Sequence, residues 1–236
     1  MSQQIVEQAG VSGSGSGQVR GVIFDVDGTL VDSNTAHAQA WADALWEHGF
    51  SVSFERVLEL IGMGGDNLLP EAIQVEKDSA IGERLAERRG EIFKSRYLPR
   101  LKAFGQTRAL VERIKQDGIR VAVASSAQQD ELETLLNIAQ VDDLFEAVTS
   151  SDDAENSKPD PDIIQAALAR LSLPPEQAIM IGDTEYDLEA SAKAGVRVIA
   201  FRSGGRTDEQ LQGAVAIYDD PADLLAHYDQ SPLAAR

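Results

Sequence analysis

The sequence predicts an α/β protein in which helices cover both faces of a parallel sheet and a helical domain interrupts the sheet. Short apolar runs alternate with helical patterns from about residue 107 to the C-terminus, which is typical of such a sheet. Residues 34–100, by contrast, read as consecutive helices with no convincing strand between them. The chain has 236 residues and is 43% hydrophobic, enough for one large domain or a domain and a smaller companion.

The first expected strand is "GVIFDV" at residues 21–26, an apolar run that ends in turn signals. Three further runs have the same buried character and two are shorter and weaker; they lie at 119–126, 178–183 and 196–201, and at 145–150 and 214–219. Helical periodicity separates them at 107–118, 130–139, 161–172 and 185–195. Because ligands of open parallel sheets bind at the carboxyl ends of the strands, we expect the functional site there.

Between the first two strands, helices are expected at 34–49, 54–62, 66–74 and 79–98. We therefore divide the chain into a core of residues 21–34 and 102–236 and an inserted helical domain of residues 35–101. Trp41 and Trp46 are expected in the core of that insert. Residues 1–20 are polar with a Gly/Ser tract, and we interpret them as a flexible leader, either native or a remnant of expression.

Composition limits the partners. The net charge of −18 makes nucleic acid and anionic membrane surfaces poor partners, so we expect neither. No apolar run approaches the length of a membrane span, and the N-terminus lacks the features of a signal peptide. Cysteine is absent, which excludes disulfides and fits a cytoplasmic protein. A small anionic substrate would need a local positive site.

Acidic, hydroxyl and amine side chains follow the expected strands. The residues concerned are Asp25, Asp27, Ser125, Lys158, Asp183 and Asp187. A parallel sheet would bring them to one edge, where the carboxylates would repel one another unless a cation or a proton neutralised them. Oxygen ligands without His or Cys favour Mg²⁺. One carboxylate could then attack a phosphorus atom while a second, two residues on, exchanges protons with the leaving oxygen and the attacking water.

These segments resemble a known family. "DVDGTLVDS", the strand that ends at Ser125, "SKPDPD" and "GDTEYD" are similar, in order, to the four motifs of the haloacid dehalogenase-like hydrolase superfamily. The resemblance spans residues 21 to about 200 and implies a Rossmann-like core. The insert resembles the helical cap of the phosphoglycolate phosphatase and beta-phosphoglucomutase branch.

The resemblance implies a role for each matching residue. Asp25 is expected to be the nucleophile and a Mg²⁺ ligand, and Asp27 the general acid/base and a ligand through its backbone carbonyl. Asp183 is expected to ligate the metal, while Asp187 orients metal-bound water or Lys158. The residues expected to hold the phosphoryl group or the substrate beside them are Ser125, Lys158, Gly28 and Thr29.

Other candidates keep two interpretations open. Gly64 and Gly65 in "GMGGD" form either a loop that reaches the substrate or a simple turn between helices. His37 either touches substrate or is packed or solvated. Ser126 either donates its backbone N–H to phosphate or serves a turn. Arg89 either reaches a substrate anion or, with Arg88 and Lys94, belongs to a surface of ion pairs, which we favour slightly. Asp32 is expected to cap the first helix of the insert, a role Ser33 and Asn34 could also fill.

The sequence thus predicts a Mg²⁺-dependent phosphatase that hydrolyses a small phosphorylated metabolite, phosphoglycolate-like or a sugar phosphate, as a monomer or homodimer. Asp27 argues against a dehalogenase, because a halide leaving group needs no proton. A sugar phosphomutase remains the alternative reaction, although Gly65 stands about where the beta-phosphoglucomutase cap loop carries an arginine. A catalytically weak metabolite-binding or regulatory protein remains the alternative of another class.

Overall fold

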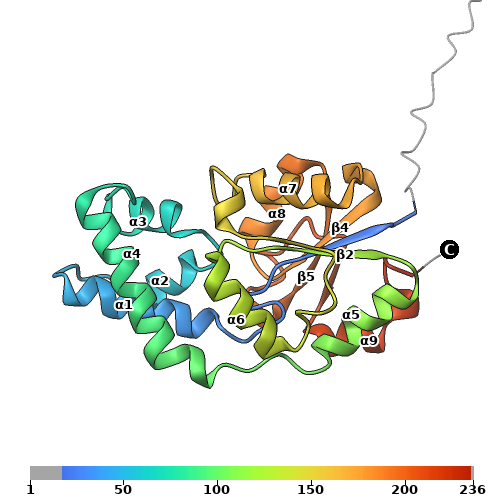
Figure 1. Cartoon of the computed structure of the whole chain (residues 1–236), viewed down its shortest axis with the longest axis horizontal. Helices are drawn as coiled ribbons and strands as arrows, with labels where there is room; N and C mark the ends of the chain where they lie inside the picture. Colours follow the sequence, from blue (N-terminus) through green and yellow to red (C-terminus); the bar gives the residue numbers. More distant parts are fainter. Residues whose placement is uncertain (1–17, 235–236) are drawn as a thin grey trace, which may run out of the picture.

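The computed structural model describes residues 18–234, and its centre is a six-stranded sheet in which every pair of neighbours is parallel (Figure 1). The strand order is β3-β2-β1-β4-β5-β6. The strands are β1 (Gly21–Phe24), β2 (Arg120–Ala124), β3 (Ala147–Thr149), β4 (Ala178–Gly182), β5 (Arg197–Phe201) and β6 (Ala216–Tyr218). All six lie within the ranges that the apolar runs predict.

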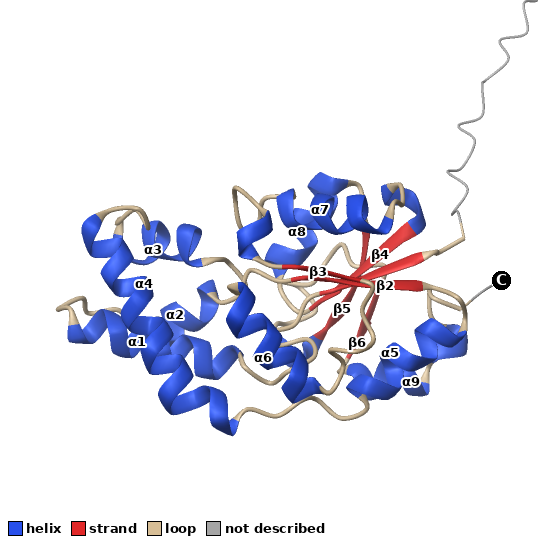
Figure 2. Ribbon diagram, viewed as in Figure 1, coloured by secondary structure: helices blue, strands red, loops and turns tan. Residues whose placement is uncertain are grey.

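Helices cover both faces of this sheet, as Figure 2 shows. Helices α5 (Thr107–Gln116), α6 (Gln129–Ala139) and α9 (Pro221–Ala226) pack on one face, and α7 (Asp162–Leu171) and α8 (Glu185–Ala194) on the other. Because side chains alternate along a strand, Val22 and Phe24 of β1 join the first hydrophobic cluster while Ile23 joins the second. The α/β fold with its Rossmann-like parallel sheet is therefore confirmed.

The register of the sheet brings the predicted site residues together. Phe24 at the end of β1 is opposite Val123 of β2 and Ile181 of β4. The residues that follow these strands therefore leave the sheet at one edge, side by side. Asp25, Ser125 and Asp183 all belong to this edge.

Four helices between β1 and β2 form a separate layer with its own hydrophobic cluster: α1 (Asn34–Glu47), α2 (Phe54–Leu60), α3 (Gly65–Ile73) and α4 (Ala80–Ile92). Helix α4 continues through a π-helical turn at Phe93–Tyr97 and a 3-10 turn at Leu98–Arg100 before the chain returns to the core. Figure 1 shows these helices beyond the edge where the strands end. We call residues 35–101 the cap. The rest of the described chain contains four short 3-10 turns: Ser151–Asp153, Pro175–Gln177, Arg202–Gly204 and Tyr228–Gln230.

Two local expectations are wrong. Trp41 is buried in the cap, but Trp46 is 76% exposed, because α1 packs through the face that carries Trp41 and Leu45. Asp32 does not cap α1: the N-cap residue is Ser33, and its hydroxyl makes no capping bond but donates to the Asp27 carboxylate instead. Side chains at the start of α1 thus serve the site rather than the helix end.

Most of the expected leader, residues 1–17, lies outside the described residues. Within residues 18–234, no helix is both long and apolar enough to cross a membrane.

Candidate functional site

Asp25 and Lys158 form a buried ion pair at the carboxyl edge of the sheet. Asp25 directly follows β1, and its backbone N–H donates to the carbonyl of Ile181. Lys158, in the loop before α7, is 1% exposed and places its Nζ 2.6 Å from Asp25 Oδ1. The same ammonium donates to the carbonyl of Ala124 at the end of β2 and lies 2.7 Å from Asp187 Oδ1. The ammonium thus donates hydrogen bonds to Asp25 and Ala124 and forms an ion pair with Asp187.

Three buried carboxylates gather beside this lysine. Asp25, Asp183 and Asp187 each offer one oxygen, and these oxygens lie within 4.8 Å of one another. Oxygen ligands at this spacing fit a hard divalent cation. The second oxygen of Asp187 already accepts bonds from the backbone N–H groups of Asp183 and Thr184 and from the Thr184 hydroxyl. Asp187 is thus held in place by the protein through this second oxygen.

Crowding and burial shift the proton affinities of these groups. Burial, with repulsion from Asp187 and Asp27, raises the pKa of Asp25 to about 7 despite the nearby Lys158. Burial and then Asp25 and Asp187 raise the pKa of Asp183 well above its usual range, although Asn34 and Thr29 donate to it. Burial alone would lower the pKa of Lys158, but its two carboxylate partners outweigh burial and raise it. The cluster therefore has an excess of negative charge that a cation would relieve.

Asp27 occupies a different environment two residues away. Its Oδ1 accepts a 2.5 Å bond from the Ser33 hydroxyl and lies 2.7 Å from His37 Nε2. Burial would raise the pKa of Asp27, but His37, Ser33 and the more distant Arg89 together lower it below its ordinary value. Its carboxylate is not part of the group of described acids whose oxygens lie close enough together to share a cation.

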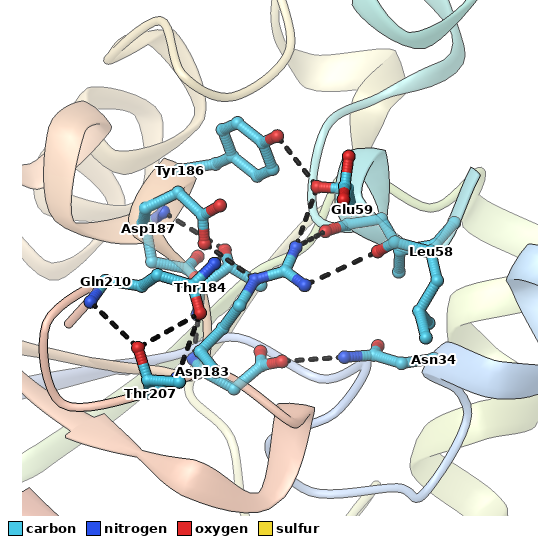
Figure 3. A network of polar contacts seen from close by, with 12 residues as sticks. Asn34, Leu58, Glu59, Asp183, Thr184, Tyr186, Asp187, Thr207 and Gln210 are labelled. Atoms are coloured by element: carbon cyan, nitrogen blue, oxygen red, sulfur yellow. Dashed lines mark hydrogen bonds and ion pairs between the residues drawn. The ribbon is translucent and has the colours of Figure 1, made fainter. Parts of the chain in front are cut away.

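Gly28 and Thr29 lie beneath the site and contact Asp183. The Thr29 hydroxyl is fully buried and donates to Asp183 Oδ1 at 3.0 Å. A Cβ on Gly28 would lie 2.2 Å from Asp183 Oδ2. Asn34, at the start of α1, donates to the same Oδ2 at 2.8 Å (Figure 3). The geometry makes Gly28 and Thr29 supports of a carboxylate.

The cap loop with Gly64 and Gly65 reaches the core. A Cβ on Gly64 would lie 2.1 Å from the Ser157 hydroxyl, so only a residue without a side chain fits there. Just beyond the loop, Asp66 accepts from the backbone N–H of Ser157, and Asn67 donates to the carbonyls of Ser157 and Lys158. The loop thus packs against the segment that carries the buried lysine.

A second set of contacts holds the other end of this loop. Arg206, which is 8% exposed and follows β5, donates to the carbonyls of Glu59 and Ile61 at 2.9 and 3.0 Å, at the C-terminal end of α2. The Tyr186 hydroxyl donates to the carbonyl of Glu59, and Figure 3 shows Tyr186 facing this helix end. A guanidinium at a helix C-terminus also complements the helix dipole. The cap is therefore fastened to the core on both sides of its glycine loop.

Two adjoining cavities lie between cap and core. The smaller, which we call the chamber, has a volume of about 60 Å³ and is lined by many of the predicted site residues: Asp25, Asp27, His37, Gly64, Gly65, Arg89 and Ser126. The larger, the vestibule, measures about 520 Å³ and shares Trp41, Gly65, Arg89, Ser126, Ala127 and Glu131 with the chamber. Ser125, Lys158 and Asp183 are not among the residues that line the chamber. Of these, Ser125 is 1% exposed, and its Oγ accepts from the backbone N–H of Ala127.

Arg89 lies where the two cavities meet. It is not part of the surface ion pairs that Arg88 and Lys94 form with Glu47, Glu91 and Asp130. Its guanidinium instead donates to Glu131 Oε2 at 2.9 Å and contacts His37 Nδ1 at 2.9 Å, above the rings of Trp41 and Phe93. Nδ1 then accepts from Arg89, so that Nε2 of a neutral His37 carries the proton and donates to Asp27.

Sequence reasoning missed three residues of the site: Asn34 as a partner of Asp183, Glu131 as a partner of Arg89, and Arg206 as the contact with α2. Asn34 looks like a capping residue, and Glu131 like an ordinary acid in the first turn of a helix. Arg206 is one of many arginines in the sequence, and only the fold brings it to α2. The residue types alone carried no signal for these contacts.

A capped parallel sheet whose carboxyl edge holds acids around a buried lysine defines a class of hydrolytic enzyme. The model of the family "Haloacid dehalogenase-like hydrolase" matches residues 22–201, most of the chain. The chain belongs to this family.

Relatives and solved structures agree with this assignment. The chain is 28% identical to a phosphoglycolate phosphatase of Aquifex aeolicus over 76% of its length and 83% of that protein. It is 25% identical to the pyrophosphatase PpaX of Bacillus mycoides over 88% of its length and 96% of that protein. A hydrolase from Pseudomonas syringae has 29% identity and a TM-score of 0.84, over 92% of this chain and all of that one. A beta-phosphoglucomutase of Clostridium difficile shares the fold at 20% identity, with a TM-score of 0.79 over 90% of this chain and 96% of that one.

Proposed function

We propose that this chain is a Mg²⁺-dependent phosphatase that hydrolyses a small phosphomonoester through a phosphoryl group carried on Asp25. The observation that carries the proposal is the buried carboxylate of Asp25, which lines the chamber and whose Oδ1 lies 2.6 Å from Lys158 Nζ. The two phosphatase relatives named above are consistent with this chemistry. We also propose the cap and core boundaries given above and a cytoplasmic location.

In the first half of the reaction, an oxygen of Asp25 attacks the phosphorus atom and the alcohol departs on the opposite side. Lys158 and backbone N–H groups stabilise the charge on the phosphoryl oxygens. The departing oxygen needs a proton, and Asp27 is the chamber carboxylate we assign to supply it. Because His37 and Ser33 favour the ionised form of Asp27, these contacts must loosen while Asp27 carries that proton.

In the second half, water attacks the phosphorus atom and releases Asp25. Asp27 is then ionised and accepts the proton of that water, a role for which its lowered pKa suits it. The chamber, at about 60 Å³, has room for little more than the transferring group and water. Exclusion of bulk water strengthens the electrostatic interactions inside.

We assign Mg²⁺ to the carboxylates of Asp25 and Asp183, with Asp187 fixing Lys158 and the metal's surroundings. When bound, the cation neutralises the acidic cluster and the charge of the transferring oxygens. Asn34 and Thr29 orient Asp183 for this task through their bonds to its two oxygens.

A phosphomutase is less well supported. Such an enzyme returns the phosphoryl group to its substrate and must hold a second phosphate against the cap. Among the described residues that line the chamber, Arg89 is the one lysine or arginine, and Glu131 already neutralises it. The site therefore favours release of the phosphoryl group to water.

A screen of phosphorylated metabolites, with p-nitrophenyl phosphate as a generic ester, tests the proposal. We expect Mg²⁺-dependent release of inorganic phosphate that disappears in Asp25→Asn. Conversion of a hexose 1-phosphate to its 6-phosphate would favour the mutase. Tight metabolite binding without turnover would favour a binding or regulatory protein.

A further inference from the structure

The junction between chamber and vestibule, which we call the neck, carries polar atoms without partners. Among the described buried side-chain atoms, Arg89 Nε, Ser126 Oγ and Glu131 Oε1 make no hydrogen bond. All three residues line both cavities. Glu131 is only 2% exposed, so its free oxygen has lost water without gaining a partner, which is costly. Atoms of this kind in a substrate cavity indicate a missing ligand group.

The position of the neck identifies that group. The chamber at Asp25 holds only the phosphoryl group, so the alcohol portion of a phosphomonoester must extend through the neck into the 520 Å³ vestibule. The first atoms of the leaving group beyond the ester oxygen therefore pass Arg89 and Glu131.

Hydrogen-bond chemistry selects among leaving groups. Arg89 Nε–H is a donor and the carboxylate oxygen of Glu131 is an acceptor. One hydroxyl group can satisfy both, since it accepts and donates. A carboxylate or a phosphate would satisfy Arg89 but face the negative charge of Glu131, and an ammonium would satisfy Glu131 but face Arg89.

The charges around the neck also favour an uncharged leaving group. The Arg89 guanidinium lies 2.9 Å from the Glu131 carboxylate, so the two side chains together carry no net charge. Four carboxylates and three cationic side chains line the described vestibule, so negative charge is in excess there. An anionic leaving group would enter a region of negative potential.

We infer that Glu131 is a specificity-determining residue that, with Arg89, selects phosphate esters of uncharged hydroxylated alcohols, such as polyols and sugars, over esters whose leaving group is charged. The inference rests on the proposed phosphatase function. By this preference the chain differs from phosphatases that act on substrates whose leaving group carries a carboxylate or a second phosphate.

Three esters of similar size test the inference: 2-hydroxyethyl phosphate, phosphoglycolate and O-phosphoethanolamine, compared by kcat/KM at saturating Mg²⁺. The wild-type enzyme should prefer the hydroxyethyl ester at least about tenfold over each charged ester. Glu131→Gln keeps the shape of the side chain but leaves Arg89 uncompensated, so the ratio of phosphoglycolate to hydroxyethyl phosphate should rise about tenfold or more. A wild-type preference for either charged ester overturns the inference without any variant.

The control is Glu133→Gln, on the same helix but exposed and bonded to Gln129. It should leave the ratio unchanged; an equal change in both variants would mean a general charge effect and overturn the role of Glu131. Turnover of p-nitrophenyl phosphate distinguishes failure of the specificity inference from failure of the proposed phosphatase function. If this ester is hydrolysed in an Asp25-dependent way but Glu131→Gln does not change the ratio, the specificity inference fails and the phosphatase stands. If no phosphomonoester is hydrolysed, both fail.

Discussion

Asp25 and Asp27 lie two residues apart, yet the protein gives their carboxylates opposite proton affinities. Asp25 is buried beside two other acids, and its pKa rises to about 7. Asp27 is bonded to Ser33 and His37, and its pKa falls. Neighbouring carboxylates with divergent pKa values are typical of sites that divide nucleophilic and proton-transfer roles.

Replacement of Asp25 by asparagine should abolish turnover without unfolding the protein. The amide is a poor nucleophile, so kcat should fall by about three orders of magnitude or more. Lys158 keeps its partner Asp187, and one repelling charge is lost, so thermal stability should hold. Steady-state kinetics measures the loss of kcat, and calorimetry measures thermal stability. Wild-type rates in this variant would show that Asp25 is not the nucleophile.

Metal binding should stabilise the protein more at high pH. The folded-state pKa of Asp25 lies above its unfolded value of 3.8, so without metal its contribution to stability is greatest at low pH and is lost as the pH rises through about 7. Mg²⁺ competes with protons for the same carboxylates. The increase in Tm on adding Mg²⁺ should therefore be larger at about pH 8 than at about pH 5.5.

Asp183→Asn should remove most of this metal-dependent increase, whereas Asn at the exposed Asp32 should not change it. Scanning calorimetry at the two pH values provides the comparison. If Mg²⁺ raised the Tm equally at both pH values, or equally in both variants, the metal would not bind at Asp25 and Asp183.

At the scale of elements, the glycine loop of the cap depends on close packing. A methyl group at Gly64 would overlap Ser157, next to Lys158. The loop ends at the N-terminus of α3, where Asp66 and Asn67 bond to the same core segment. Close packing at Gly64 and the hydrogen bonds of Asp66 and Asn67 together set the position of the loop over the chamber.

Gly64→Ala should displace the loop and lower kcat/KM about tenfold or more, because small misplacements around a reacting group are costly. Gly105→Ala is the matched control, since a Cβ there meets nothing within 4 Å. The measurement is kcat/KM for p-nitrophenyl phosphate in the two variants. Equal values would show that the loop does not form the chamber.

The strands and the motifs that follow them could be predicted from the sequence because each is marked by a local pattern of residues. Apolar runs at Gly21–Phe24 and Ala178–Gly182 mark strands because both faces of the sheet are buried. The motifs after these strands locate Asp25 and Asp183 because strand ends of a parallel sheet meet. Contacts between distant segments, such as Arg89 with Glu131 and Arg206 with α2, depend on how the cap lies on the core, and no local pattern encodes that. Trp46 shows the same limit, since helical periodicity alone did not separate it from Trp41.

At the scale of the whole molecule, the cap and core are joined by polar contacts at the site itself. Arg206 bonds α2 before the glycine loop, Asn67 bonds the core after it, and Arg89 joins α4 to α6. Interfaces of this polar kind permit relative motion of domains. Substrate entry and product release then require these bonds to break and re-form.

Arg206→Ala should favour an open cap, because the carbonyl of Ile61 loses its donor, that of Glu59 keeps only Tyr186, and both gain water when the cap leaves the core. We expect KM to rise about tenfold and the radius of gyration in solution scattering to increase. Arg202→Ala is the control: Arg202 lies in the same loop but pairs with Asp208 and Asp219 of the core. An unchanged KM in Arg206→Ala would show that this contact does not govern closure.

The most direct test of the account is chemical trapping of the phosphorylated residue. The enzyme is mixed with p-nitrophenyl phosphate and Mg²⁺, quenched within one turnover and treated with borohydride, which reduces an acyl phosphate to an alcohol. Peptide mass spectrometry should then find homoserine at position 25 and at no other aspartate. Release of phosphate with an unreduced Asp25, or with the reduced residue elsewhere, would contradict it.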